Sequence, residues 1–203
     1  MKALILVDIQ NDFIPGGALP VHEGDQVVPI ANKLIDKFDL IVATQDWHPS
    51  DHGSFAANHT GKNIGEIIEL NGLQQILWPV HCVQESDGAH FHPQLMINKV
   101  HKIIPKGTNA EIDSYSGFND NGHLKSTGLA DYLKNKGVTD VYICGLATDY
   151  CVKFTAIDAV QENFKTYVIQ DACRGVNLNP GDVQHAISEM KEAGCHIVES
   201  SQL

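Results

Sequence analysis

Hydrophobic positions in the first part of the chain fall into short continuous runs separated by a segment with helical spacing. Residues 2–7 form an apolar run that only Lys2 interrupts, and Asp8 follows the run directly. Residues 40–44 form a second run. Such runs are typical of strands that are buried on both faces. Between them, residues 25–38 place apolar side chains at the spacing of one helix face. This pattern predicts a strand, a helix and a second strand.

The same alternation resumes after residue 100. The pattern predicts strands over 100–105, 138–144, 166–170 and 196–199, and helices over 124–135, 149–162 and 180–193. Strands that alternate with helices predict an α/β fold. We expect a three-layer, doubly wound sheet of mainly parallel strands with helices on both faces, formed as a single domain over 1–203.

Residues 45–98 interrupt this alternation. They are rich in His, Asp, Asn, Gly and Pro and show weak periodicity. A segment of this length without regular elements is usually functional or disordered when it lies inside a compact domain. Its aromatic residues Trp47, Phe55, Trp78 and Phe91 argue against disorder. We therefore expect a loop-rich insertion that serves the functional site.

Composition narrows the classes of partner and compartment. The chain has 14 Lys and Arg against 25 Asp and Glu, a formal net charge of −11, which argues against nucleic acid as a partner. The sequence shows neither a signal peptide nor an apolar stretch long enough to span a membrane. Its five cysteines are odd in number and form no CxxC pair, which favours reduced thiols in the cytoplasm. The expected partner is a small molecule, and a homo-oligomer remains open.

Three side chains follow predicted strands, at the edge where parallel sheets carry their working sites. They are Asp8, Lys106 and Cys151. Taken singly, each has an ordinary structural explanation: the Asp as a turn former, the Lys as a surface charge, and the Cys as a small buried apolar side chain. Taken together, they suit nucleophilic catalysis, because Asp8 can take up and return a proton and Lys106 favours a thiolate. Thr148 is expected to cap the following helix, so that the helix dipole also lowers the pKa of Cys151.

The insertion also contains a candidate metal site. Asp46 and His48 follow the second predicted strand, His52 comes four residues later, and His81 lies further along. A carboxylate with two or three imidazoles suits Zn²⁺, Fe²⁺ or Mn²⁺. Because the chain has 11 His, each of them could instead serve in surface or capping hydrogen bonds.

A series of motifs, in a consistent order and spacing, extends from residue 7 to residue 152. They are VDIQNDF (7–13), GGAL (16–19), ATQDWHPSDHGSFA (43–56), WPVHCV (78–83), FHPQL (91–95), KG (106–107), SYSGF (114–118) and GLATDYCV (145–152). On these motifs the chain resembles the nicotinamidases and pyrazinamidases of the isochorismatase-like cysteine hydrolase superfamily.

The resemblance implies a role for each of the three strand-end residues. It implies that Cys151 is the nucleophile, that Asp8 is the acid and base, and that Lys106 supports both. It also implies a cis peptide between Leu146 and Ala147. The oxyanion hole would then consist of the N–H groups of Ala147 and Cys151.

The resemblance further implies one divalent metal ion, with Zn²⁺ ahead of Fe²⁺ and Mn²⁺. Its ligands would be Asp46, His48 and His81, and His52 matches a fourth ligand that only some members use. The residues expected around the substrate ring are Phe13, Trp78, Tyr115, Leu146 and Ala147.

The activity implied is metal-dependent hydrolysis of nicotinamide to nicotinate and ammonia, and of pyrazinamide to pyrazinoate, through a thioester. This reaction would serve NAD salvage. A rival within the superfamily is another amidase, such as an N-carbamoyl or ureidoacrylate amidohydrolase, but a ureido group has less reason than a pyridine nitrogen to meet a metal. Two rivals of different classes are a non-catalytic small-molecule-binding module and a redox protein using Cys151, for which no resolving cysteine lies nearby.

Overall fold

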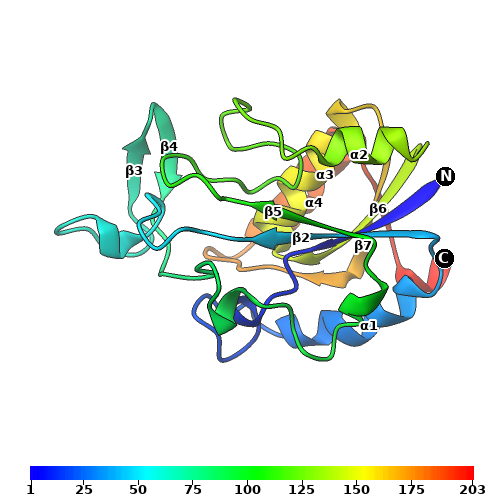
Figure 1. The fold of residues 1–203 in the computed structure, drawn as a ribbon, viewed down its shortest axis with the longest axis horizontal. Helices are drawn as coiled ribbons and strands as arrows, with labels where there is room; N and C mark the ends of the chain where they lie inside the picture. Colours follow the sequence, from blue (N-terminus) through cyan, green and yellow to red (C-terminus); the bar gives the residue numbers. More distant parts are fainter.

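A six-stranded parallel sheet forms the centre of the computed structural model, which describes residues 1–203 (Figure 1). Its strand order is β5-β2-β1-β6-β7-β8. The strands are β1 (Lys2–Val7), β2 (Leu40–Asp46), β5 (Lys102–Lys106), β6 (Asp140–Leu146), β7 (Lys165–Arg174) and β8 (His196–Val198). All neighbouring pairs are parallel, so the carboxyl ends of the strands share one edge.

Helices cover both faces of this sheet, as the sequence predicted. Helix α1 (Val27–Ile35) packs on one face, and α2 (Leu129–Asn135), α3 (Lys153–Gln161) and α4 (Asp182–Glu192) lie on the other (Figure 1). The central strand β1 is fully buried from Ala3 to Val7, which explains its continuous apolar run. None of the helices is long and apolar enough to cross a lipid bilayer.

Three predicted elements differ from the structure by four or more residues at one end. The helix expected over 124–135 begins only at Leu129, whose N–H group donates to Thr127 Oγ1 at 3.2 Å, while Leu124 is 83% exposed. The first turn of the helix expected over 149–162 is a separate π-helical turn that precedes α3. The strand expected over 166–170 continues to Arg174, because an irregularity in its pairing with β6 accommodates the polar residues that interrupt its apolar run.

The insertion between β2 and β5 contains a hairpin that the sequence analysis missed. Strands β3 (Ile67–Leu70) and β4 (Leu73–Ile76) pair antiparallel and project from the sheet (Figure 1). The turn is Asn71–Gly72, with φ angles of 49° and 82°. An Asn-Gly pair between two short runs is a strong hairpin signal, but each strand is only partly buried and its alternation is weak.

Candidate active site

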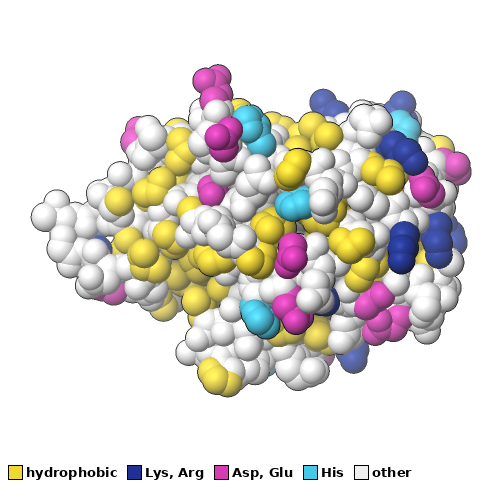
Figure 2. Space-filling model, turned by 90° about the horizontal axis from the view of Figure 1, so that it is seen from below, with side chains coloured by type: hydrophobic (Ala, Val, Ile, Leu, Met, Phe, Trp, Pro, Cys, Tyr) yellow, Lys and Arg dark blue, Asp and Glu magenta, His cyan; other side chains and the backbone are white.

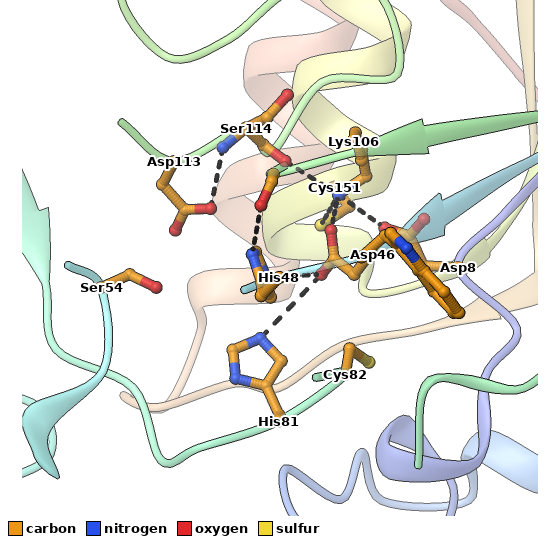
Figure 3. Close-up of polar contacts among 12 residues, drawn as sticks. Asp8, Asp46, His48, Ser54, His81, Cys82, Lys106, Asp113, Ser114 and Cys151 are labelled. Atoms are coloured by element: carbon orange, nitrogen blue, oxygen red, sulfur yellow. Dashed lines mark hydrogen bonds and ion pairs between the residues drawn. The ribbon is translucent and has the colours of Figure 1, made fainter. Parts of the chain in front are cut away.

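The ammonium group of Lys106, the last residue of β5, lies at the centre of the site (Figure 3). Its Nζ is 2.9 Å from Asp8 Oδ2 and 3.4 Å from Cys151 Sγ, and it forms an ion pair with Asp46 Oδ1. It also donates to the Ser114 carbonyl oxygen at 2.8 Å. Burial by itself lowers the pKa of a lysine, but the Asp46 and Asp8 carboxylates outweigh burial and raise the pKa of Lys106 well above its usual value. Lys106 is therefore a buried cation.

Asp8 follows β1 and faces both the lysine and the thiol. Its backbone is in the left-handed region, with φ at 46°, and its Oδ1 accepts a hydrogen bond from Thr44 Oγ1 at 2.6 Å. Burial raises the pKa of Asp8 to about 6, with Lys106 opposing the rise and Asp46 adding to it. The carboxylate is thus mainly ionised at neutral pH and remains basic enough to accept a proton.

Cys151 lies in the π-helical turn Thr148–Val152, directly after β6. The Ala147 carbonyl accepts the N–H groups of Tyr150 at 3.1 Å and of Val152 at 3.0 Å, which closes the turn. The sulfur and the carboxylate oxygens of Asp8 and Asp46 lie within 4.8 Å of one another. The peptide between Leu146 and Ala147 is cis, as the resemblance implies.

The expected preformed thiolate at a capped helix terminus is not what the structure shows. The turn has no side-chain cap from Thr148 or any other residue. Burial raises the pKa of the Cys151 thiol well above its usual value; Lys106 lowers it, while Asp8 and Asp46 raise it further. The protein part of the site therefore favours a neutral thiol, and the proton needs an acceptor. Asp8 is the carboxylate placed to take it.

A carboxylate and two imidazoles meet beside this set. Asp46 Oδ2 is 3.6 Å from His48 Nε2 and 3.9 Å from His81 Nε2 (Figure 3). The other ring nitrogen of each histidine faces a backbone carbonyl: His48 Nδ1 is 2.9 Å from Gly107 O, and His81 Nδ1 is 2.8 Å from Pro79 O. A carbonyl can only accept, so each Nδ1 carries a hydrogen and each Nε2 is turned toward Asp46. Burial lowers the pKa of His48, but the Asp46 carboxylate outweighs burial and raises that pKa, so a bound cation would take the place of the proton on His48 Nε2.

The electrostatics of this cluster suit a divalent cation. Burial lowers the pKa of His81 to about 4, with neighbouring His48 lowering it further, so that its imidazole is neutral. Burial opposes ionisation of Asp46, but Lys106 and His48 outweigh it and hold the pKa of this carboxyl far below its usual value. One carboxylate and two imidazoles whose Nε2 atoms face it are a donor set for Zn²⁺, Fe²⁺ or Mn²⁺.

His52 lies next to the cluster of Asp46, His48 and His81 rather than within it. Its ring centroid is 4.4 Å from that of His48. One of its ring nitrogens, one ring nitrogen of His48 and one carboxylate oxygen of Asp113 lie within 4.8 Å of one another. Burial lowers the pKa of His52 to about 4. Its Nδ1 is 2.7 Å from Ser54 Oγ, whereas its buried Nε2 has no hydrogen-bond partner.

Hydrogen bonds to backbone groups join the segments that carry the cluster. The Gln10 side chain accepts from the Asp46 N–H group at 2.8 Å and donates to the Asp46 carbonyl at 2.8 Å. The His48 N–H group donates to the Cys82 carbonyl at 3.0 Å, and the Cys82 N–H group donates to Asp12 Oδ2 at 2.7 Å. The sequence analysis treated Gln10 and Asp12 only as letters of a motif, although their position directly after β1 placed them at this edge.

A cavity opens onto both the thiol and the metal-ligand cluster. It is lined by Phe13, Leu19, Asp46, His48, Trp78, His81, Asp113, Tyr115, Ala147, Tyr150, Cys151 and Val176. Of the residues expected around the ring, Leu146 alone is absent, because its side chain is fully buried outside the cavity. Trp78 Nε1 donates to the Tyr115 hydroxyl at 3.1 Å, which joins two of the aromatic walls.

Four lining residues were not singled out from the sequence as contacting the substrate. They are Leu19, Asp113, Tyr150 and Val176. Tyr150 precedes Cys151 but received no role, and Val176 follows β7, the neighbour of β6. The rule that sites form at the carboxyl ends of parallel strands did not identify Val176, because the sequence analysis ended this strand at Gln170 rather than at Arg174. Leu19 and Asp113 lie in irregular segments for which the pattern gave no position.

Comparison with known proteins gives consistent matches. Residues 2–202 match the family described as "Isochorismatase domain". The chain is 50% identical over 197 residues to the nicotinamidase of Escherichia coli (strain K12), and the match covers 95% of this chain and 92% of that protein. It is also 49% identical to a solved nicotinamidase/pyrazinamidase of Acinetobacter baumanii, with a TM-score of 0.96 and coverage of 99% of this chain and 97% of that one.

A third match contains a metal ion. The structure of the pyrazinamidase of Pyrococcus horikoshii in complex with zinc is 44% identical, with a TM-score of 0.79, and the match covers 98% of each chain.

Proposed function

This chain belongs to the isochorismatase family and hydrolyses nicotinamide to nicotinate, and on that premise we propose that Cys151 is the nucleophile, with Asp8 as the acid and base. The observation that carries the proposal is the meeting of a thiol, a carboxylate and a buried ammonium at one end of the cavity. We further propose that pyrazinamide is hydrolysed at the same site, because its ring differs from nicotinamide by one nitrogen and relatives of this chain are pyrazinamidases.

The first half of the reaction forms a thioester. Asp8 accepts the thiol proton of Cys151, and the sulfur attacks the carboxamide carbon. The N–H groups of Ala147 and Cys151 hold the oxyanion that forms. When this intermediate collapses, Asp8 gives the proton to the departing nitrogen and ammonia leaves. Lys106 remains an ammonium throughout and stabilises the negative charge as it moves between the sulfur and the carboxylate.

The second half releases nicotinate. Asp8 takes a proton from a water molecule, which attacks the thioester carbon, and the proton then returns to the sulfur of Cys151.

The residues that would hold the metal are Asp46, His48 and His81, with His52 as an optional fourth. A divalent cation held there, Zn²⁺ in preference to Fe²⁺ or Mn²⁺, would supply Lewis-acid chemistry that orients the ring through its nitrogen and withdraws electron density from the carboxamide.

The setting of this reaction belongs to the same proposal. The chain works as a single domain over 1–203, with residues 45–98 as its metal-binding insertion. Its place is the cytoplasm, which the five free cysteines support. Its partner is the small-molecule substrate, and its acidic charge balance supports the absence of a nucleic-acid partner.

A pair of cysteine variants tests the nucleophile. We expect Cys151→Ala to lose at least about 10³-fold in kcat, because the covalent route is closed. Cys195→Ala, which removes another buried thiol that contacts the Ala156 carbonyl of α3 and does not line the cavity, should keep its activity. The measurement is ammonia release from nicotinamide, together with mass spectrometry of acid-quenched wild-type enzyme for the nicotinoyl adduct. Ammonia release by Cys151→Ala at the wild-type rate would disprove the covalent route.

A further inference from the structure

Asp149 is a buried carboxylate that the reaction does not use. It lies in the turn Thr148–Val152, two residues before Cys151, and is 5% exposed. No lysine or arginine pairs with it. Its two oxygens instead accept backbone N–H groups from a distant segment: Oδ1 is 2.9 Å from the nitrogen of Val176, and Oδ2 is 2.7 Å from that of Asn177.

The segment that Asp149 binds is the loop between β7 and α4, residues 175–181. Val176 brings its side chain into the wall of the substrate cavity, together with Cys151 and Ala147. The neighbouring Gly175 permits the close approach. A Cβ atom there would lie 3.0 Å from Asp149 Oδ1 and 2.2 Å from Val183 Cγ2 of α4.

We propose that Asp149 is a positioning residue that sets the width of the substrate slot by holding Val176 against the ring. Hydrogen bonds to a carboxylate are stronger than those between neutral groups, and both bonds here lie in a part-buried position. The turn Thr148–Val152 thus carries Cys151 and also, through Asp149, fixes Val176 in the cavity wall. A slot of fixed width admits flat, unsubstituted rings such as those of nicotinamide and pyrazinamide and disfavours ring-substituted carboxamides.

This inference rests on the proposed function, because it takes Cys151 as the group that the slot presents to the substrate. It differs from that proposal in what it predicts. Releasing the loop should weaken substrate binding and relax selectivity, while the groups that perform the chemistry stay in place. Failure of the covalent route would appear in Cys151→Ala, whereas failure of this inference would appear only in the comparison of loop variants.

The test compares steady-state kinetics of Asp149→Asn, Val176→Ala and the double variant. We expect Asp149→Asn, which keeps only one acceptor, to raise KM for nicotinamide about tenfold with kcat within about threefold. In the Val176→Ala background the same change should alter KM by less than about twofold, because both substitutions open the same wall. The selectivity for nicotinamide over ring-methylated nicotinamides should fall in every variant that opens the slot.

Two further variants separate positioning from loss of fold. Asp171→Asn is the matched control, because its carboxylate also accepts a backbone N–H group, that of Ser200, but Asp171 does not line the cavity. It should leave KM and selectivity unchanged. If Asp149→Asn does not fold, Gly175→Ala displaces the same carboxylate and should reproduce the rise in KM. The proposal would be overturned by an unchanged KM in the loop variants or by a fall in kcat alone. It would also be overturned if Asp149→Asn raised KM by the same factor with and without Val176→Ala.

Discussion

Gly107 shows how one residue without a side chain supports a neighbouring ligand. It follows Lys106, its φ angle is 62°, and its carbonyl accepts the hydrogen of His48 Nδ1. A Cβ atom at this position would lie 2.3 Å from His48 Cε1 and 2.6 Å from His48 Nδ1. Because real Cβ atoms do not approach this closely, any side chain at residue 107 must displace the imidazole.

We therefore expect Gly107→Ala to weaken metal binding roughly 10–100-fold, the usual loss when the group that orients a ligand is disturbed. Gly137→Ala is the matched control, because Gly137 also has a positive φ, 71°, but open space around it. The control should cost only about 1–2 kcal/mol of backbone strain and keep its affinity. Competition between the protein and a chromophoric chelator for Zn²⁺ measures both, and equal affinities would contradict this role for Gly107.

Single residues were the part of the site that the sequence predicted best. Asp8, Lys106 and Cys151 were placed together by the rule that parallel strands end at one edge, and the structure brings them together. The protonation state of Cys151 was predicted wrongly, because the sequence shows a lysine and a helix start but not the degree of burial. The position of His52 beside the metal-ligand cluster depends on loop geometry, which spacing along the chain does not encode.

At the level of elements, regular strands and helices were predictable and the insertion was not. Central strands such as β1 leave a continuous apolar signature, whereas β3 and β4 are short and half-buried. Residues 47–101 contain little other regular structure, and isolated bridges, such as those of His48 with Val83 and Phe55 with Trp78, join distant positions of the segment. Their organisation therefore depends on side-chain contacts between distant positions, and the cluster of Asp46, His48 and His81 is one of these.

Removing the metal should consequently loosen the insertion more than the sheet. A bound ion stabilises only the conformation that holds its ligands together, and the loop segments lack the continuous ladder of hydrogen bonds that holds the sheet. We expect hydrogen exchange in peptides spanning 47–58 and 78–83 to accelerate by about tenfold or more after chelation. Peptides from β1 and β6 serve as internal controls and should not change. Equal acceleration throughout the chain would indicate global destabilisation instead.

The whole molecule is acidic, and its charges are unevenly distributed. On the face shown in Figure 2, Lys and Arg side chains gather toward the end that carries both termini in Figure 1, while acidic side chains occur along its length. The substrate is neutral, so this field does not steer it toward the cavity. The product nicotinate is an anion, and the net charge of −11 opposes its return.

Ionic strength should separate these two ligands. We expect kcat/KM for nicotinamide to change by less than about twofold between roughly 10 mM and 500 mM NaCl, since there is no long-range attraction to screen. Inhibition by nicotinate should strengthen over the same range, because salt screens its repulsion. Initial rates at several nicotinate concentrations measure both effects. A steep fall of kcat/KM with salt would show that electrostatic attraction contributes to substrate capture.

The central position of β1 also has a consequence for synthesis of the chain. Ala3 pairs with Leu40 on one side and with Val141 on the other. A growing chain therefore presents Asp8 and the cluster of Asp46, His48 and His81 long before β6 and Cys151 have emerged. One edge of β1 must wait unpaired for β6, as a template for wrong partners. With Cys151 as the nucleophile, hydrolysis begins only after β6 has docked against β1, so catalytic competence itself reports that docking.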